Sequence, residues 1–329
     1  MSTSRQVTPA RLTIAGVGLI GGSLAAAARA AKVAGEVLGF GRTPESLETA
    51  RARGLVDRVT RDAREAAAAD LIVVAAPLAA CAGIATALAP HARPGTVLTD
   101  VGSVKAKPLA ELEAIWAPVG PVVGAHPIAG AETAGPAAAR ADLFRGRVCV
   151  LTPTPATDMA ALSRVRALWE AVGARVEEMA PAVHDELLAR VSHLPHLVAW
   201  ALVGAAGKAR AAGKKPLEYA GTGFRDATRI AASPAMLWAE ILLANRGPIG
   251  NALVDLRAAL AELEQLLARG DADALARALE AARRRGSPSA LLEPDAERAR
   301  SPASSPSRAT SRSRTGRCSS ARSPRGRRA

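Results

Sequence analysis

Two histidine segments carry the side chains best suited to move a proton near neutral pH. One begins at His126, directly after an apolar run at residues 122–125, and the other is Ser192-His193-Leu194-Pro195-His196. Imidazole is a common acid or base in enzymes because its pKa lies close to neutrality. We interpret His91 and His184 as ordinary loop or core histidines. His126 differs because it stands beside glycines at the end of a predicted strand, where ligands of open α/β sheets collect.

A glycine-rich turn lies near the start of the chain. Residues 16–21 read G-x-G-x-x-G, follow an apolar run at residues 12–15 and precede an alanine-rich helical stretch at residues 23–34. In this motif the first glycine allows a tight turn, the second lets the backbone approach a pyrophosphate, and the third lets the helix pack on the strand. The helix N-terminus adds amide donors for the phosphates. The pattern predicts a dinucleotide site at Gly16, Gly18, Leu19, Ile20 and Gly21.

The end of the second predicted strand, at residues 37–41, bears on the cofactor. A site selective for NAD usually carries Asp or Glu about 20 residues after the glycines, where it binds the ribose. Here the chain has Gly41, Arg42 and Thr43. Arg42 can pair with a 2′-phosphate, and no carboxylate repels that group. We therefore expect NADP, with NAD as the alternative, and contacts from Arg42, Thr43 and Pro77, which follows another predicted strand.

The strands that position these segments are continuous apolar runs separated by helical stretches. Such runs are typical of a parallel sheet with helices on both faces. They lie at residues 12–15, 37–41, 71–75, 96–100, 122–125 and 148–151. From residue 182 onward the pattern is helical, as in residues 252–268, where leucines recur at helical spacing. We predict a Rossmann-type doubly wound α/β domain at residues 11–181, followed by an all-helical domain at residues 182–285.

Composition separates a nearly neutral body from a basic tail. The net charge is +13, but ten arginines and no acidic residue follow from Arg298 onward. We predict that residues 286–329, rich in Arg, Ser and Pro, and residues 1–10 are disordered. The uncharged run at 71–90 contains Pro77 and predicts a strand and helix rather than a membrane span. Three separated cysteines make disulfides and a zinc site improbable. We expect a cytoplasmic protein with no metal.

Five motifs, in order and at family spacing, resemble prephenate/arogenate dehydrogenases of tyrosine biosynthesis. They are Gly-Leu-Ile-Gly-Gly-Ser-Leu at 18–24, Asp-Val-Gly-Ser-Val-Lys at 100–105, His-Pro-Ile-Ala-Gly-Ala-Glu at 126–132, Ser-His-Leu-Pro-His at 192–196, and Gly-Phe-Arg-Asp-Ala-Thr-Arg at 223–229. The resemblance runs from about Leu12 to Leu267. It implies a helical domain that forms a homodimer, an active site in the cleft between domains, and oxidative decarboxylation of prephenate or arogenate with NAD(P).

The resemblance also implies roles for particular residues. His126, helped by Ser103, would accept the proton of the ring hydroxyl, and Lys105 would lie near the nicotinamide. Arg229 would bind the ring carboxylate, for which its planar fork is suited. The remaining substrate contacts would be His196, Ser192, Asp226 beside Arg229, Glu132, and Trp238, which resembles a tryptophan that reaches across from the partner subunit. Whether Glu132 attracts an ammonium group or gates the pocket through Arg229 stays open.

Two other functions fit parts of the sequence. A 3-hydroxy acid dehydrogenase joins a similar nucleotide domain to a helical domain, but it uses a catalytic lysine and lacks the His-Pro-Ile-Ala-Gly segment. Lys208, Lys214 and Lys215 are in no such motif. A nucleic-acid-binding protein is supported by the arginine tail alone, which lacks aromatic residues for base stacking.

Overall fold

The computed structural model describes residues 9–130 and 133–287. The described chain falls into two compact units, with the division between Ala259 and Leu260. Most of the predicted N-terminal segment and almost all of the predicted tail lie outside the described residues, as does Glu132.

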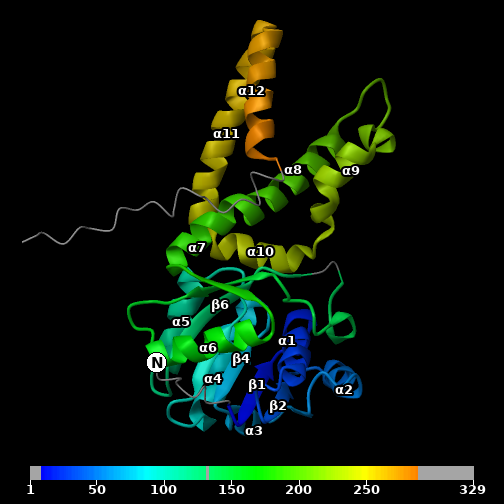
Figure 1. The fold of residues 1–329 in the computed structure, drawn as a ribbon. Coiled ribbons are helices and arrows are strands. Elements are labelled where there is room, and N and C mark those ends of the chain that lie inside the picture. Colours follow the sequence, from blue (N-terminus) through cyan, green and yellow to red (C-terminus); the bar gives the residue numbers. More distant parts are fainter. Residues whose placement is uncertain (1–8, 131–132, 288–329) are drawn as a thin grey trace, which may run out of the picture. The chain divides into compact units, whose positions relative to one another are not determined.

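The first unit begins with an eight-stranded sheet in the order β3-β2-β1-β4-β5-β6-β7-β8 (Figure 1). The strands are β1 (Arg11–Ala15), β2 (Glu36–Phe40), β3 (Arg58–Thr60), β4 (Leu71–Val74), β5 (Val97–Asp100), β6 (Val122–Pro127), β7 (Val148–Thr152) and β8 (Arg175–Glu178). The strands from β3 to β6 in this order are parallel to one another, which confirms the predicted doubly wound sheet.

Helices cover both faces of the sheet, which explains why its strands are apolar without interruption. Successive side chains of a strand point to opposite faces. In β4, Leu71 and Val73 pack with α1 (Leu19–Ala30) and α6 (Met159–Ala171). Ile72 and Val74 pack on the other face, which α3 (Ala63–Ala67), α4 (Leu78–Leu88) and α5 (Ala106–Trp116) cover. The run at 71–90 is therefore a buried strand followed by helix α4, as predicted.

The sheet departs from the expected parallel order at one edge. Strand β7 runs antiparallel to β6, and β8 runs parallel to β7. The two strands that the apolar pattern does not reveal, β3 and β8, are short, and most of their residues are exposed or half-buried. Gly124 permits the close β6–β7 pairing, because a Cβ there would lie 2.4 Å from the Thr152 hydroxyl oxygen.

Helices make up the rest of the first unit, as predicted from residue 182 onward. They are α7 (Pro181–Leu188), α8 (Leu194–Lys208), α9 (Thr222–Thr228), α10 (Ala235–Ala244) and the first part of α11 (Arg246–Arg269). Between α7 and α8, residues Ala189–His193 form a π-helical turn. This places Pro195 in the first turn of α8, where a missing amide hydrogen costs little.

The second unit contains the end of α11 and α12 (Ala272–Arg285). Gly270 has a φ of +65°, which lets the chain turn between the two helices. Asp271 caps α12 by accepting a hydrogen bond from the amide of Ala274 at 2.9 Å. Among the described residues, one helical stretch, Pro181–Lys208 in the first unit, is long and apolar enough by composition to cross a membrane.

Candidate active site

The glycine turn forms an open cradle at the N-terminus of α1. Gly16 has a φ of +106°, and a Cβ there would lie 2.2 Å from the Ala75 carbonyl oxygen. A Cβ on Gly21 would lie 1.9 Å from the carbonyl oxygen of Gly16, whereas one on Gly18 would meet nothing within 4 Å. Gly18 precedes α1 without a side-chain cap, so the first amides of that helix are available to a phosphate. These residues fit a dinucleotide.

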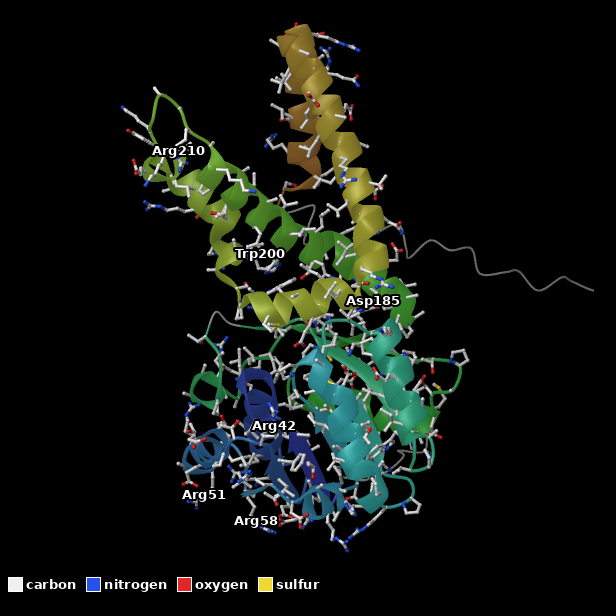
Figure 2. All side chains as sticks on the ribbon, turned by 180° about the vertical axis from the view of Figure 1, so that it is seen from behind. Arg42, Arg51, Arg58, Asp185, Trp200 and Arg210 are labelled. Atoms are coloured by element: carbon white, nitrogen blue, oxygen red, sulfur yellow. The ribbon has the colours of Figure 1, made fainter. Side chains whose placement is uncertain are left out.

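Neighbouring strand ends lie beside this cradle. The amide of Gly16 donates to the carbonyl of Phe40 at 2.8 Å, which ties the glycine turn to the end of β2. Arg42 is exposed there (Figure 2), and Thr43 precedes α2 (Pro44–Ala52). Pro77 follows β4, the other neighbour of β1, and precedes α4. Arg42, Thr43 and Pro77 therefore follow the carboxyl ends of strands that neighbour β1, at the same end of the sheet as the glycine turn.

A buried ion pair holds the backbone beside His126. Lys105 is 1% exposed, and its ammonium donates to the carboxylate of Asp100 and, at 2.7 Å, to the carbonyl of Ala125. Asp100 in turn accepts the amides of Gly102 at 2.8 Å and Ala125 at 3.3 Å. The cation predicted to lie near the nicotinamide is thus engaged in positioning β6. Its contact with a cofactor stays a prediction.

His126 belongs to a hydrogen-bonded chain of three buried side chains. Its Nδ1 lies 2.8 Å from Nε2 of His184, whose Nδ1 lies 2.8 Å from Oδ1 of Asp185. Asp185 (Figure 2) also accepts the amides of Lys105 and Ala106, both at 2.8 Å, and so caps α5. The Asp185 carboxylate therefore joins α7 to the N-terminus of α5, and His184 links it to His126 of β6. We call Asp185, His184 and His126 the histidine chain.

The surroundings keep His126 uncharged. Burial, and then the neighbouring His184, Lys105 and His193, hold the pKa of His126 well below its usual value of 6.5. A neutral imidazole is the form that accepts a proton. Its Nε2 makes no hydrogen bond to any described residue, so this nitrogen remains for a substrate.

A third buried histidine, His193, adjoins the histidine chain. Asn245 donates from its amide nitrogen to the carbonyl of Asp185 at 2.8 Å and lies 2.9 Å from Nδ1 of His193. Nε2 of His193 is buried and has no hydrogen-bond partner in the described part of the chain. Burial lowers the pKa of His193 to about 4, although Asp185 opposes the shift.

The predicted substrate contacts of the helical region gather around His196. Its ring stacks on Trp238, with ring centroids 3.5 Å apart and planes 23° apart. Its Nδ1 lies 2.9 Å from the carbonyl oxygen of Ser192, four residues earlier. Burial lowers the pKa of His196, the Ser192 carbonyl raises it, and the cation of Arg229 lowers it. Arg229 therefore lies near His196. Trp238 stacks on the His196 ring of its own subunit.

Of the remaining predicted site residues, those that the structure describes form no hydrogen bond with His126 or His196. Ser103 lies in the loop after β5, beside β6, and is half-buried. Asp226 is exposed on α9, one turn before Arg229, and Glu132 lies outside the described residues. Residues 9–130 and 133–287 hold no group of three His, Cys, Asp or Glu side chains able to bind a metal.

Sequence reasoning missed three residues of this site, His184, Asp185 and Asn245, and gave His193 no role of its own within its motif. One sequence signal pointed to His184 and Asp185. They are adjacent in a segment predicted to be helical, and an acid that is buried there needs a partner. The contacts themselves join residues 52 to 80 positions apart. No local pattern shows such contacts.

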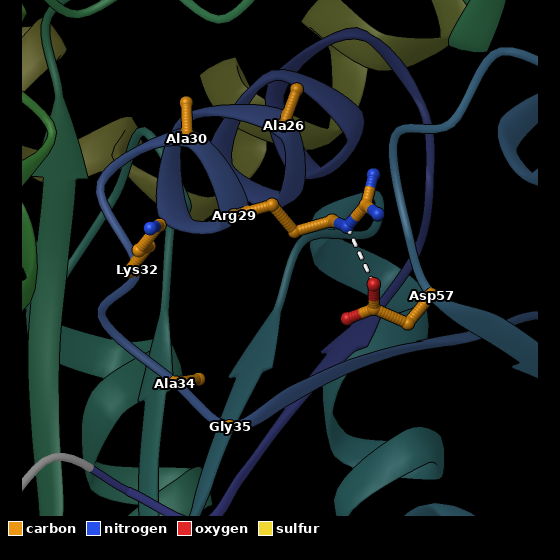
Figure 3. A pocket seen from close by; sticks show the side chains of 7 residues that line it. All are labelled: Ala26, Arg29, Ala30, Lys32, Ala34, Gly35 and Asp57. Carbon is orange, nitrogen blue, oxygen red and sulfur yellow. Dashed lines mark hydrogen bonds and ion pairs between the residues drawn. The ribbon is translucent and has the colours of Figure 1, made fainter.

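A separate hollow of about 490 Å³ lies at the other end of α1 (Figure 3). Its lining includes Arg29, Lys32, Gly35 and Asp57, and the Arg29 guanidinium pairs with Asp57 at 2.7 Å. The start of β2 follows directly after Gly35, so this hollow is at the sheet edge opposite the glycine turn. It is not part of the candidate site.

Comparison with known proteins assigns both parts of this arrangement. Residues 24–178 match the family model for the prephenate dehydrogenase nucleotide-binding domain, and residues 180–281 match that for the prephenate dehydrogenase dimerization domain. The chain belongs to the prephenate dehydrogenase family. It is therefore an oxidoreductase that uses a nicotinamide cofactor, and the matched nucleotide-binding region begins shortly after the glycine turn at residues 16–21.

Individual members of the family resemble this chain along most of its length. It is 35% identical over 266 residues to cyclohexadienyl dehydrogenase of Zymomonas mobilis, covering 80% of this chain and 90% of that enzyme. It is 32% identical to prephenate dehydrogenase of Bacillus subtilis, covering 72% of this chain and 65% of that enzyme.

Two solved structures share this fold. Prephenate dehydrogenase of Aquifex aeolicus, in complex with hydroxyphenyl propionate and NAD+, has a TM-score of 0.79 and 34% identity, covering 86% of this chain and 98% of that one. Arogenate dehydrogenase of Synechocystis has a TM-score of 0.73 and 30% identity, covering 82% and 96%.

Proposed function

We propose that this chain catalyses the NAD(P)-dependent oxidative decarboxylation of prephenate, arogenate or both, in tyrosine biosynthesis. The observation that carries the proposal is a neutral, buried His126 with one ring nitrogen left for a ligand, beside a dinucleotide cradle, in a member of this family. Relatives named for prephenate, cyclohexadienyl and arogenate substrates support the substrate class.

The reaction converts a cyclohexadienol into an aromatic ring. When bound, the nicotinamide supplies the acceptor for the hydride that leaves the ring carbon bearing the hydroxyl. Nε2 of His126 accepts the hydroxyl proton, the ring carboxylate departs as CO₂, and the ring becomes aromatic. The product is 4-hydroxyphenylpyruvate from prephenate and tyrosine from arogenate. The protein's contribution is mainly to orient substrate and cofactor and to accept this proton.

Binding roles follow from the groups around His196. Arg229 holds the ring carboxylate through its planar guanidinium, with Asp226 beside it, and Ser103 assists His126 at the hydroxyl. His196, Ser192, Trp238 and Glu132 bind the side-chain end of the substrate. His193 adds a buried nitrogen that the described part of the chain leaves without a partner.

The finer cofactor choice rests on the turn after β2. It carries Arg42 and Thr43 and no acidic side chain between Phe40 and Pro44. We infer that NADP is preferred, because Arg42 can pair with a 2′-phosphate that an Asp or Glu would repel. NAD remains the alternative.

Assembly and location are inferred from the family. Residues 180–281 match a dimerization domain, which supports a homodimer, with Trp238 also reaching the partner's site. We expect a cytoplasmic enzyme with a small-molecule substrate and no role for nucleic acid.

A four-way initial-rate assay tests the proposal, pairing prephenate or arogenate with NAD or NADP and following the reduced cofactor by absorbance. Turnover with either substrate supports it, and the pattern reports both preferences. No turnover in all four, from folded protein that binds NAD(P), would contradict it and lead to a panel of 3-hydroxy acids.

A further inference from the structure

The protonation of His126 is set by residues that do not touch the substrate. We propose that Asp185 and His184 are positioning residues that hold His126 in the tautomer with its proton on Nδ1. This leaves the lone pair on Nε2, where the substrate hydroxyl delivers its proton. The inference rests on the proposed role of His126 as base and adds the mechanism that prepares it.

The argument begins at the carboxylate, whose acceptor role is fixed by two backbone amides. Oδ1 of Asp185 accepts from the amide of Lys105, and Oδ2 accepts from the amide of Ala106, both at 2.8 Å. Both oxygens therefore face N–H donors, and both lie at the N-terminus of α5, which favours a negative charge. An amide can only donate, so both oxygens of Asp185 act as acceptors here.

The remaining directions follow from one another. Oδ1 also faces Nδ1 of His184 at 2.8 Å, so that nitrogen carries the proton and donates. We assign His184 as the neutral imidazole, which has one N–H, and Nε2 of His184 is then an acceptor. It faces Nδ1 of His126 at 2.8 Å, so Nδ1 of His126 carries the proton and donates. Nε2 of His126 is then the acceptor nitrogen.

Charged and titratable neighbours favour a neutral His126. Lys105 and Asp100 form a buried pair beside Ala125, and Cys149 of β7 pairs in the sheet register with Pro127, the residue after His126. Burial raises the pKa of the Cys149 thiol, so it remains protonated. Burial keeps His193 neutral as well, by lowering its pKa to about 4. The ammonium of Lys105 further disfavours a second cation on His126 before substrate binds.

The same bonds stabilise the product of proton transfer. When Nε2 of His126 gains the hydroxyl proton, the ring becomes an imidazolium, and its Nδ1–H still donates to His184. His184 remains hydrogen-bonded to the Asp185 carboxylate, so the new charge faces an aligned chain of acceptors that ends in a negative group. No further proton has to move.

Nitrogen NMR of the intact wild-type protein, labelled with ¹⁵N at histidine, tests the assignment without relying on activity. Long-range ¹H–¹⁵N spectra distinguish the two neutral tautomers, and signals are assigned with His126→Asn and His184→Asn. We expect His126 and His184 both to carry the proton on Nδ1. A proton on Nε2 of His126, in protein shown to be active, would overturn this inference while leaving the proposed function intact.

A rescue experiment tests the catalytic consequence. We expect His184→Ala to lower kcat by about 10²-fold, within the range for general-base catalysis, with a much smaller change in KM. Added imidazole, which can both donate and accept a hydrogen bond, should raise the kcat of the variant at least tenfold. Pyrrole is the matched control, because it fills the same space and has an N–H but no acceptor nitrogen.

The outcomes separate a positioning role from a packing role. Rescue by imidazole and not by pyrrole supports the proposal. Equal rescue by both rings, rescue by neither, or a kcat within threefold of wild type would overturn it. Should His184→Ala fail to fold, the wild-type tautomer measurement decides alone.

Discussion

The two halves of the candidate site differ in how completely one chain builds them. Around His126, the side chains of His184, Asp185 and Lys105 are buried and hydrogen-bonded to one another or to backbone. Around His196, Trp238 is half-buried and Arg229 is exposed. The half around His126, proposed to accept a proton, is thus held in place by its own hydrogen bonds. The half around His196, proposed to bind carboxylates, is more exposed and lies within the region that matches the dimerization domain.

The difference follows from what each half must do. A base needs a fixed tautomer and a fixed pKa, and burial supplies both as long as every polar group has a partner. An arginine that is to bind a substrate carboxylate needs access from solvent, and Arg229 is exposed. Changes in the buried half should therefore alter folding or kcat, and changes in the open half should alter KM.

The largest effect on stability is expected at the buried ion pair. Lys105→Met leaves the Asp100 carboxylate buried without its ammonium, which should lower the free energy of unfolding by about 3–5 kcal/mol. Urea unfolding followed by circular dichroism measures it. Lys107→Met, an exposed lysine of the same helix, should change stability by less than about 0.5 kcal/mol. Normal stability of Lys105→Met with a raised KM for the cofactor would instead identify Lys105 as a cofactor contact.

Acid should destabilise the protein through its buried histidines. The pKa of His193 is lowered from 6.5 to about 4, so between these values the unfolded state binds a proton that the folded state does not. Stability should therefore fall as the pH falls through this window, with a contribution from His193 of about 1–3 kcal/mol. Thermal melts of wild type and His193→Gln measure it. The variant should lose less stability than wild type, and exposed His91→Gln should match wild type; equal losses in all three would contradict the account.

In the open half, Arg229→Ala should weaken substrate binding. Loss of a charge-assisted bond of about 1.5–3 kcal/mol corresponds to a rise in KM of about 10- to 150-fold, with a smaller change in kcat. Steady-state kinetics with the preferred substrate measures this. Arg225→Ala, an exposed arginine on α9, serves as control. An unchanged KM would remove Arg229 from the binding site.

The smallest effect is expected at the cofactor turn. Arg42→Ala should raise the KM for NADP by about tenfold and leave the KM for NAD unchanged. The tenfold change corresponds to the loss of one exposed charged contact of about 1.4 kcal/mol. Arg51→Ala on α2, whose guanidinium pairs with Glu48, is the control. Equal effects on both cofactors would place Arg42 away from the 2′-phosphate.

The sequence predicted those parts of the molecule that local patterns encode. The glycine turn follows β1 and opens α1, and six strands, β1, β2 and β4 to β7, are the continuous apolar runs expected of a sheet buried on both faces. Strands β3 and β8 escaped because edge strands bury too little to be apolar. The antiparallel direction of β7 was not predicted, because a buried apolar run has the same composition in a parallel and in an antiparallel strand.

The site was predictable to the same extent and for the same reason. His126, Ser192 with His196, and Arg229 belong to motifs, and the structure brings His196 together with Arg229 and Trp238. His184 was interpreted as an ordinary histidine, because its partner His126 is 58 residues away. The buried position of Lys105 depends likewise on Asp100 and Ala125 folding around it.

The most direct test of the account is single-turnover hydride transfer by His126→Asn, followed as formation of the reduced cofactor with saturating prephenate or arogenate. Asn retains polarity and size but cannot accept the proton as imidazole does. We predict a rate about 10²–10⁴-fold below that of wild type, with substrate affinity changed less than threefold. A rate within threefold of wild type would contradict the central claim that His126 is the base.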